Sequence, residues 1–460
     1  MPFTAAIAVP HPPIILPEIG KGEEQKIAAT AAAYRQAMEF LARDKPDTVV
    51  ILSPHSILYA DYFHISPGAA AHGDMSRFRA PQVSFDVAYD TDLVASLSAV
   101  CKERGIAAGT LGERDPSLDH GTMVPLYFLR QVLPEAKIVR IGLSRLSPFE
   151  HYEFGRALRQ SADLSKQRVA LIASGDLSHK LLAEGPYGFA PEGPEYDEAI
   201  MRTLGAGDFL GVLRLSPQLC ESAAECGQGS FMIMAGVFDR QAVVCQALSH
   251  EGTFGVGYGV VTCEGKGEDA GRNFGEQLKA LEAREAQERR AREDEYVRLA
   301  RLSVETYVRT GQGAALPSEL SAELTSRRAG AFVSLKKHGQ LRGCIGTIVA
   351  TTPNVASEIL QNGISACSRD PRFPPVTPQE LDALVYSVDV LGEHEPTTVE
   401  GLDVKRYGVI VESGGKRGLL LPDLDGVDTV EQQIDIARQK AGIPPGAPLS
   451  LFRFEVIKHT

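Results

Sequence analysis

The first 265 residues alternate short apolar runs with longer amphipathic stretches, and this alternation constrains the fold more than any other feature of the chain. The apolar runs, rich in Val and Ile, are TAAIAV, TVVILS, AKIVRIGL, RVALIASG and AVVCQALS. An amphipathic stretch between two of them is EEQKIAATAAAYRQAMEFLARD. Strands alternating with helices are typical of an α/β domain whose helices cover a central sheet. Ligands of such sheets bind where the loops converge at the strand ends.

The pattern changes after residues 264–294, which are Gly-rich at first and then densely charged. The helix formers and mixed charges of the second half of this segment predict a solvated helix. From Glu295 onward, apolar and aromatic residues at helical spacing begin another domain, followed by the strand-like runs GAFVSLKK, ALVYSVDVL and GVIVES.

The expected organisation is therefore two domains joined by a linker, because 460 residues exceed one typical core. We expect an N-terminal α/β domain over residues 1–265, with a central sheet flanked by helices. A charged linker over residues 266–289 leads to a smaller C-terminal α+β domain over residues 290–460.

Charge and cysteine content argue against several classes of protein. The net charge of -12 argues against nucleic acid or an anionic membrane as the main partner. The seven cysteines are odd in number and form no CxxC pair, which argues against a zinc cluster or a disulfide framework and favours reduced thiols. The chain has no signal-peptide pattern and no run of about 18 apolar residues. We expect a cytoplasmic protein without a membrane span.

Two histidines follow early strands directly. His11 lies in "AVPHPP", where prolines end the strand and fix the chain as it leaves the sheet. His55 lies in "VVILSPHS", where a second apolar strand stops at Pro-His. A single histidine of this kind commonly only accompanies the end of a strand. Two histidines in matching places predict a shared metal site.

Further ionisable groups border buried elements in the same domain. Asp176 and His179 lie in "SGDLSHK" after an apolar strand, where a functional role is favoured and a helix N-cap is the alternative. His120 precedes the apolar stretch GTMVPLYFL, and Glu225 with Cys226 precedes another. Three other histidines have no such setting and are expected at the surface: His64, His72 and His151.

These motifs together resemble a known family. His-Pro-Pro, Ser-Pro-His, Asp-His-Gly, Ser-Gly-Asp-Leu-Ser-His and Glu-Cys-Gly occur in this order over residues 1–262. They are similar to the catalytic subunits of class III extradiol dioxygenases (the LigB type) and to the related Memo family. In the dioxygenases, two histidines and one carboxylate hold Fe(II) and leave positions for the catechol oxygens and O₂.

The resemblance implies a set of metal ligands and catalytic groups. His11 and His55 would bind one divalent ion, Fe(II) in a dioxygenase, with Zn or Cu as alternatives. Glu225 is the favoured third ligand. Memo-like proteins have a cysteine in this segment, so Cys226 stays open as the alternative, and a thiolate would favour softer metals.

The same resemblance implies roles for three other residues. His179 matches the acid–base histidine of the family. The unperturbed pKa of a histidine lies near physiological pH, so this residue could take a proton from a catechol and return it later. His120 matches a histidine that faces the substrate or supports a ligand. Asp176 would orient His179 or line the pocket.

The second domain carries the stretch "LRGCIGT", residues 341–347. Together with "SRDPRFPPVTPQEL" and "GLLLPDLDGVDTVEQQIDIARQKAGI", it resembles the AMMECR family over residues 290–458. Arg342 could bind an anion and Cys344 could be a nucleophile or a redox thiol. The alternative is a tightly packed turn with an inert Cys344, and we expect Asp370, Arg372 and Phe373 near this turn.

Two functions remain open. The first is a non-haem Fe(II) dioxygenase that cleaves a small catecholic or related aromatic substrate with O₂. The second is a Memo-like metal-binding protein that modifies a metabolite or macromolecule without ring cleavage, working with a separate radical-SAM partner because the chain has no CxxxCxxC. The oligomeric state, including a homo-oligomer, is left open.

Overall fold

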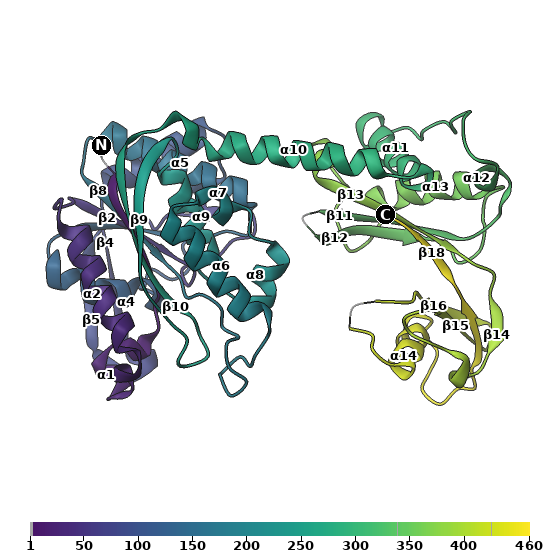
Figure 1. The fold of residues 1–460 in the computed structure, drawn as a ribbon, viewed down its shortest axis with the longest axis horizontal. Helices are drawn as coiled ribbons and strands as arrows, with labels where there is room; N and C mark the ends of the chain where they lie inside the picture. Colours follow the sequence, from purple (N-terminus) through teal and green to yellow (C-terminus); the bar gives the residue numbers. More distant parts are fainter. Residues whose placement is uncertain (1–2, 338, 425) are drawn as a thin grey trace. The chain divides into compact units, whose positions relative to one another are not determined.

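The structure of the protein is a computed structural model that describes residues 3–337, 339–424 and 426–460 (Figure 1). The chain divides into two compact units, Met1–Leu281 and Glu282–Thr460, called here the N-terminal and C-terminal units. The predicted linker, residues 266–289, contains the end of a strand and most of the helix α10 (Phe274–Arg292). The division between the two units falls inside this helix, after Leu281.

A six-stranded sheet forms the centre of the N-terminal unit, as the apolar runs predict. Its order is β7-β2-β8-β1-β10-β9. The four strands β7, β2, β8 and β1 are parallel, and β10 and β9 add an antiparallel edge. The strands are β1 (Phe3–Val9), β2 (Thr48–Ser53), β7 (Lys137–Gly142), β8 (Val169–Ser174), β9 (Gln241–Glu251) and β10 (Tyr258–Glu268). The N-terminal unit is therefore an α/β domain with a mixed sheet.

Helices cover both faces of this sheet because its strands are apolar on both sides. Ile7 and Val9 of β1 face a core shared with α2 (Ala28–Ala42) and α4 (His120–Val132). Ala6 and Ala8 face the opposite core. The helices of that core are α3 (Thr91–Glu103), α5 (Pro148–Ser165), α6 (Glu192–Ala206), α7 (Phe209–Leu213) and α9 (Gln228–Val237). This double cover leaves the ends of the parallel strands as the place for a site.

Short elements complete the N-terminal unit. They are α1 (Pro17–Gly20), β3 (Phe63–His64), β4 (Ala70–Met75), β5 (Ala80–Ala88), β6 (Ala108–Gly109) and α8 (Pro217–Ala223). Strand β4 pairs with β5, and β3 pairs with β6, outside the central sheet.

The C-terminal unit contains two antiparallel four-stranded sheets. The first, in the order β12-β11-β13-β18, packs against α11 and α13, and the second, β14-β17-β15-β16, packs against α14. The helices are α11 (Glu295–Thr310), α12 (Ala322–Ser326), α13 (Val355–Ser368) and α14 (Val430–Lys440). The strands are β11 (Ala331–Lys337), β12 (Gln340–Gly346), β13 (Leu384–Leu391), β14 (Glu395–Thr397), β15 (Gly408–Ser413), β16 (Lys416–Leu420), β17 (Ser450–Phe454) and β18 (Val456–His459).

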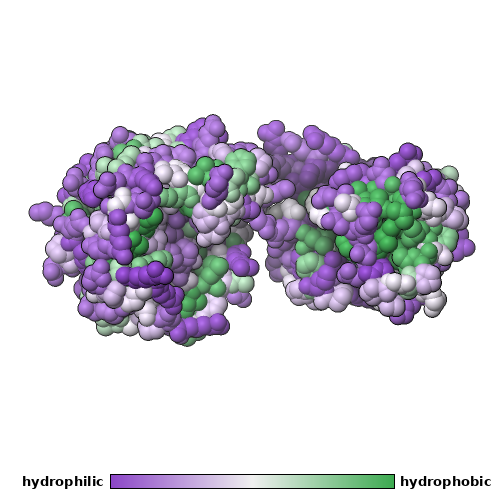
Figure 2. All heavy atoms as spheres, turned by 90° about the horizontal axis from the view of Figure 1, so that it is seen from below, coloured by the Kyte–Doolittle hydropathy of each residue, from purple (hydrophilic) through white to green (hydrophobic). Residues whose placement is uncertain are grey.

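Surface composition differs between the two units in Figure 2. The visible face of the C-terminal unit carries a broad apolar area, whereas most of the visible face of the N-terminal unit is hydrophilic. Among the described residues, no helix combines the length and the apolar composition that a bilayer span needs.

Three expectations from the sequence are wrong in the N-terminal unit. Cys245 and Cys263 form a disulfide, because β9 and β10 pair these two residues directly opposite each other. His64 and His151 are buried, at 0% and 4% exposure, whereas His72 is exposed as expected. His64 ends β3, and His151 lies on the core face of α5. No motif beside either histidine in the sequence indicates that it is buried.

The division inside α10 makes a testable prediction about where the chain can be cut. Phe274 and Leu278 belong to the core of the N-terminal unit although they lie beyond the last strand of its sheet. A fragment that ends at Leu281 keeps both side chains, whereas one that ends at Gly271 loses both. Loss of a core Phe or Leu costs about 2–5 kcal/mol. We expect the shorter fragment to melt roughly 10 °C lower in calorimetry, and equal melting temperatures would contradict this division.

Candidate metal centre

Three polar residues follow three neighbouring parallel strands at the same spacing. His11, His55 and Asp176 each lie two residues beyond the last residue of β1, β2 and β8. These strands are adjacent in the sheet, in the order β2-β8-β1, and run in one direction. Their carboxyl ends therefore bring the three side chains to one edge of the sheet.

His11 is fixed in position by its backbone and by its ring. The side chain is 1% exposed, and the backbone N–H donates to Asp176 Oδ1 at 2.8 Å. Ser174 Oγ donates to the carbonyl oxygen of Gly121 at 2.7 Å, so it accepts from His11 Nδ1 at 2.9 Å. This assigns the proton to Nδ1 and leaves the lone pair on Nε2. Burial, and then the charges of His55 and His179, hold the pKa of His11 well below its usual value, so the ring is neutral.

The lone pair of His11 points at two other possible ligands. His11 Nε2 lies 2.9 Å from His55 Nε2 and 3.6 Å from Cys226 Sγ. The donor atoms of these three residues lie within 4.8 Å of one another. His55 is exposed whereas His11 is buried, so solvent reaches the cluster from one side. We call His11, His55 and Cys226 the triad.

The distances within the triad fit a bound metal ion. Metal–nitrogen bonds of about 2.0–2.1 Å and metal–sulfur bonds of about 2.3 Å, at angles of about 90–110°, separate two nitrogens by about 2.8–3.4 Å. The same bonds separate nitrogen from sulfur by about 3.1–3.6 Å. Both distances measured from His11 Nε2 fall within these ranges. Two neutral imidazoles and a thiolate are also donors that a transition metal accepts.

Of the two adjacent candidates for the third ligand, the structure brings only Cys226 to the histidines. Glu225 turns away from them and accepts from the backbone N–H of Gln228, at the start of α9, at 2.6 Å. The hydroxyl of Tyr196 donates to the same carboxylate at 3.5 Å. Burial raises the pKa of Glu225 to about 7, opposed by these hydrogen bonds. The Glu225 carboxylate therefore stabilises the start of a helix.

A close backbone contact places Cys226. Gly175 and Gly227 pack against each other, and a Cβ built on Gly175 would lie 2.1 Å from the Cα of Gly227. The residues beside them are joined by hydrogen bonds. The backbone N–H of Asp176 donates to Cys226 Sγ at 3.2 Å, and the N–H of Cys226 donates to the Asp176 carbonyl at 3.4 Å. The two loops thus hold the thiol against His11.

Asp176 and His120 lie beside the triad. Asp176 Oδ2 is 3.9 Å from His11 Nε2, and burial raises the pKa of Asp176 to about 6. The His120 ring lies 4.0 Å from that of His55 and 5.5 Å from that of His11, centroid to centroid. Burial, followed by the charges of His55 and His11, lowers the pKa of His120 to about 3.

His179 lies in the loop after β8, in the same segment as Asp176. The segment is a loop and begins no helix, so the N-cap interpretation of this motif is wrong. The His179 ring stacks on Tyr187, with ring centroids 5.0 Å apart. Burial lowers the pKa of His179, and the charge of Asp176 opposes this effect. The ring is therefore neutral at neutral pH and can accept a proton.

Several supporting residues carry no motif in the sequence. Ser174 sets the tautomer of His11. Asp119 accepts from Ser53 Oγ and from the N–H of Thr122, in the first turn of α4, the helix that begins at His120. Arg140, 1% exposed, lies 3.8 Å from Asp119. Ser53 and Ser174 each end a strand next to a candidate site, which is the signal that could have identified them.

In the C-terminal unit, the residues around Cys344 are held by one another. Both edges of the Arg342 guanidinium are bound, by Glu380 at 2.9 and 3.0 Å and by the carbonyl of Pro374 at 2.9 Å. These contacts occupy Arg342 in packing and argue against a role in anion binding. The half-buried Cys344 receives a hydrogen bond at Sγ from Ser334 Oγ at 3.1 Å, and burial raises its pKa.

Two of the three residues that we expected near this turn, Asp370 and Arg372, contact Cys344. The N–H of Cys344 donates to Asp370 at 2.9 Å, and Arg372 donates to the Cys344 carbonyl at 3.1 Å. A Cβ on Gly343 would lie 2.3 Å from the Ala366 carbonyl oxygen, so this glycine allows close packing. A chemical role for Cys344 stays a prediction.

Comparisons with known proteins agree with this division into units. The family described as the catalytic LigB subunit of aromatic ring-opening dioxygenase matches residues 5–261, and the AMMECR1 family matches residues 297–459. A protein of Clostridium acetobutylicum is 38% identical over 98% of this chain and 98% of its own length. A protein of Thermotoga maritima is 51% identical over 36% of this chain and 98% of its own length.

Solved structures resemble parts of the chain. An uncharacterized protein from Pyrococcus horikoshii has 32% identity and a TM-score of 0.34, covering 35% of this chain and 88% of its own. One from Escherichia coli K12 has 16% identity and a TM-score of 0.37, covering 56% of this chain and 99% of its own.

Proposed function

Because the chain belongs to the family of the catalytic LigB subunit of aromatic ring-opening dioxygenase, joined to an AMMECR1-family region, we propose that its N-terminal unit is a metal-dependent protein whose ion is held by the triad. The observation that carries the proposal is the convergence of His11 Nε2, His55 Nε2 and Cys226 Sγ within 4.8 Å. A thiolate with two imidazoles suits Cu or Zn better than Fe(II).

The ligand set favours the Memo-like candidate function over ring cleavage. A bound ion would act as a Lewis acid or a redox centre for the substrate. In this candidate the protein modifies a metabolite or macromolecule together with a separate radical-SAM partner. The exposed side of His55 gives the substrate access to the centre.

Fe(II)-dependent ring cleavage of a catechol is the second candidate, and one distance favours it. Asp176 Oδ2 lies 3.9 Å from His11 Nε2, so a small movement would give two histidines and a carboxylate. That ligand set is typical of non-haem Fe(II) oxygenases. The family match supports the same candidate, because the family is described by aromatic ring opening.

In both candidates the residues beside the triad move protons. His179 is neutral and stacks on Tyr187, so its ring is oriented before substrate binds. It would accept a proton from a substrate hydroxyl and return it later. Asp176, whose pKa is raised to about 6, would hold or release a proton close to neutral pH. His120 stays neutral and would offer a hydrogen bond to the substrate.

His179→Ala tests this division of roles. We expect the variant to keep the bound metal, because the triad is intact, and to lose about 100-fold or more in turnover. Metal content is measured by mass spectrometry, and turnover by O₂ consumption with a panel of catechols. His72→Ala, an exposed histidine, is the matched control. Loss of metal in His179→Ala would make His179 a ligand and overturn its assignment here. If the wild-type protein binds metal but consumes no O₂ with any catechol, ring cleavage is excluded and the Memo-like candidate remains.

A further inference from the structure

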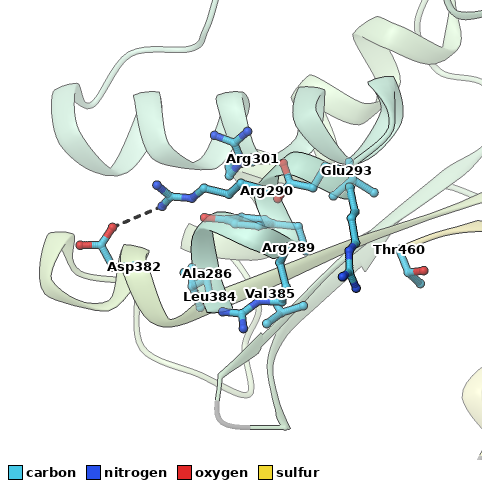
Figure 3. Close-up of a pocket in the computed structure, with 12 residues that line it drawn as sticks. Ala286, Arg289, Arg290, Glu293, Arg301, Asp382, Leu384, Val385 and Thr460 are labelled. Carbon is cyan, nitrogen blue, oxygen red and sulfur yellow. Dashed lines mark hydrogen bonds and ion pairs between the residues drawn. The ribbon is translucent and has the colours of Figure 1, made fainter. Parts of the chain in front are cut away.

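A cavity of about 160 Å³ lies within the C-terminal unit, beside the end of α10 (Figure 3). Its walls come from α10, α11, β13 and the segment that leads into β13. The residues that line it are Ala286, Arg289, Arg290, Arg292, Glu293, Val297, Arg301, Asp382, Leu384, Val385, Tyr386 and Thr460. None of the residues of the triad belongs to it, so it is a separate site.

The four arginines of the cavity fall into two groups. Arg290 is paired with Asp382 at 3.3 Å, as Figure 3 shows, and Arg301 is paired with Glu293 at 2.8 Å. Within the part of the chain that the structure describes, Arg289 and Arg292 form no ion pair and no side-chain hydrogen bond, although the charge of Arg292 acts on Glu288. Two cations at the cavity are therefore available to an anion.

A buried hydroxyl in the cavity wall also lacks a partner. Tyr386 is 3% exposed, and among the described residues its hydroxyl has no hydrogen-bond partner. The charged groups that act on it are those of Glu305, Arg301, Arg290 and Glu293, around the cavity. Burying a hydroxyl without a partner is costly, and a ligand that accepts its hydrogen bond would remove this cost.

The remaining wall is apolar and sets the size of the ligand. Val297 and Leu384 are buried, and Ala286 and Val385 extend the apolar wall. A cavity of about 150 Å³ lined by apolar side chains can hold one benzene molecule. The cavity here has a similar volume, so its apolar part accommodates a body of about one ring.

We propose that this cavity binds a small organic acid, a carboxylate attached to a ring-sized apolar body. The carboxylate accepts the hydroxyl hydrogen of Tyr386, and the charges of Arg289 and Arg292 attract it to the cavity. The body lies against Val297 and Leu384. The site is independent of the proposed metal centre, so either can fail without the other.

Benzoate, measured by calorimetry on the full chain, tests the proposal. Inorganic phosphate has the negative charge but no apolar ring, and benzyl alcohol has the apolar ring but no charge. We expect benzoate to bind, and each of the other two to bind at least about tenfold more weakly. No binding of benzoate at millimolar concentration, or equal binding of either comparison compound, overturns the proposal.

Variants locate the binding. The double variant Arg289→Ala/Arg292→Ala should weaken benzoate binding about tenfold or more, since charge-assisted hydrogen bonds are the strong ones. The control Arg284→Ala/Arg298→Ala removes the same number of positive charges, one from α10 and one from α11, at residues that do not line the cavity. Unchanged binding in the first double variant, or equal weakening in the control, overturns the assignment of the arginines.

Tyr386→Phe separates a binding role from a structural one. It removes only the unpartnered hydroxyl, so the melting temperature without benzoate should not fall. Benzoate should bind about threefold or more weakly. Unchanged affinity for benzoate would overturn the role of this hydroxyl, whatever happens to the melting temperature.

Discussion

His11→Ala, His55→Ala and Cys226→Ala are each expected to lose bound metal by more than about 100-fold in affinity. Each variant removes one donor of the triad, whose atoms lie within 4.8 Å of one another. Loss of a group that only supports a ligand already costs about 10–100-fold. The measurement is metal content by mass spectrometry after dialysis against a graded chelator, with circular dichroism to show that each variant is folded.

The variant Glu225→Gln is the control that the chain itself offers. Glu225 is adjacent to Cys226, but its carboxylate accepts from Gln228 at the start of α9. A glutamine oxygen can accept the same hydrogen bond, so the variant should fold and keep its metal. If Glu225→Gln loses the metal and Cys226→Ala keeps it, the third ligand is the carboxylate and the triad defined here is wrong.

Ser174→Ala tests the assignment of the His11 tautomer within the same series. Ser174 Oγ accepts from His11 Nδ1 and thereby leaves the lone pair on Nε2. Without this acceptor, the proton can move to the nitrogen that faces the metal. We expect a loss of affinity of about 10–100-fold, smaller than that caused by His11→Ala. Metal affinity equal to that of the wild type would contradict the tautomer assignment.

The strands of the N-terminal unit could be predicted from the sequence because both of their faces are buried. TVVILS corresponds to β2 residue for residue, and its six residues are all buried. A continuous apolar run of this length is typical of a strand in the interior of a sheet, with both faces buried. The place of His11 and His55 followed from the same runs, since a strand end fixes the direction in which the chain leaves the sheet. These predictions depend only on local sequence.

The third ligand could not be decided from the sequence because Glu225 and Cys226 are neighbours in a loop. Which of two adjacent side chains faces the histidines depends on the contact between Gly175 and Gly227, which are 52 positions apart. The disulfide between Cys245 and Cys263 depends in the same way on the register of two strands. Contacts over such separations leave no periodic signal in a single sequence.

Arg140→Met is expected to destabilise the N-terminal unit by about 3–5 kcal/mol, the cost of leaving a buried charge without its partner. Among the described residues, Arg140 has the largest of the fully buried side chains. Its guanidinium donates to Ser66 Oγ and to the Ser117 carbonyl, both at 2.6 Å. It also lies 3.4 Å from Glu113 and 3.8 Å from Asp119. Methionine fills much of the volume but neutralises neither carboxylate.

The same variant should also weaken metal binding, although Arg140 does not touch the triad. Asp119 accepts from Ser53 Oγ, which in turn accepts from the N–H of His55 at 3.3 Å. Asp119 also caps α4, whose first residue is His120. An Asp119 without its cation can rearrange and release both histidines from their positions. We expect a loss of metal affinity within the range of about 10–100-fold that supporting residues cause.

Calorimetry and metal titration on the same samples test both effects of Arg140→Met. A loss of 3–5 kcal/mol lowers the melting temperature of the N-terminal unit by roughly 10 °C. Arg43→Met is the matched control, because the pair of Arg43 with Glu264 lies at the surface and contributes at most about 1 kcal/mol. Arg140→Lys keeps the charge and should recover part of the stability. If Arg140→Met melts like Arg43→Met, the buried charge is not structural. If it is destabilised but binds metal as the wild type does, the connection through Asp119 and Ser53 does not position His55.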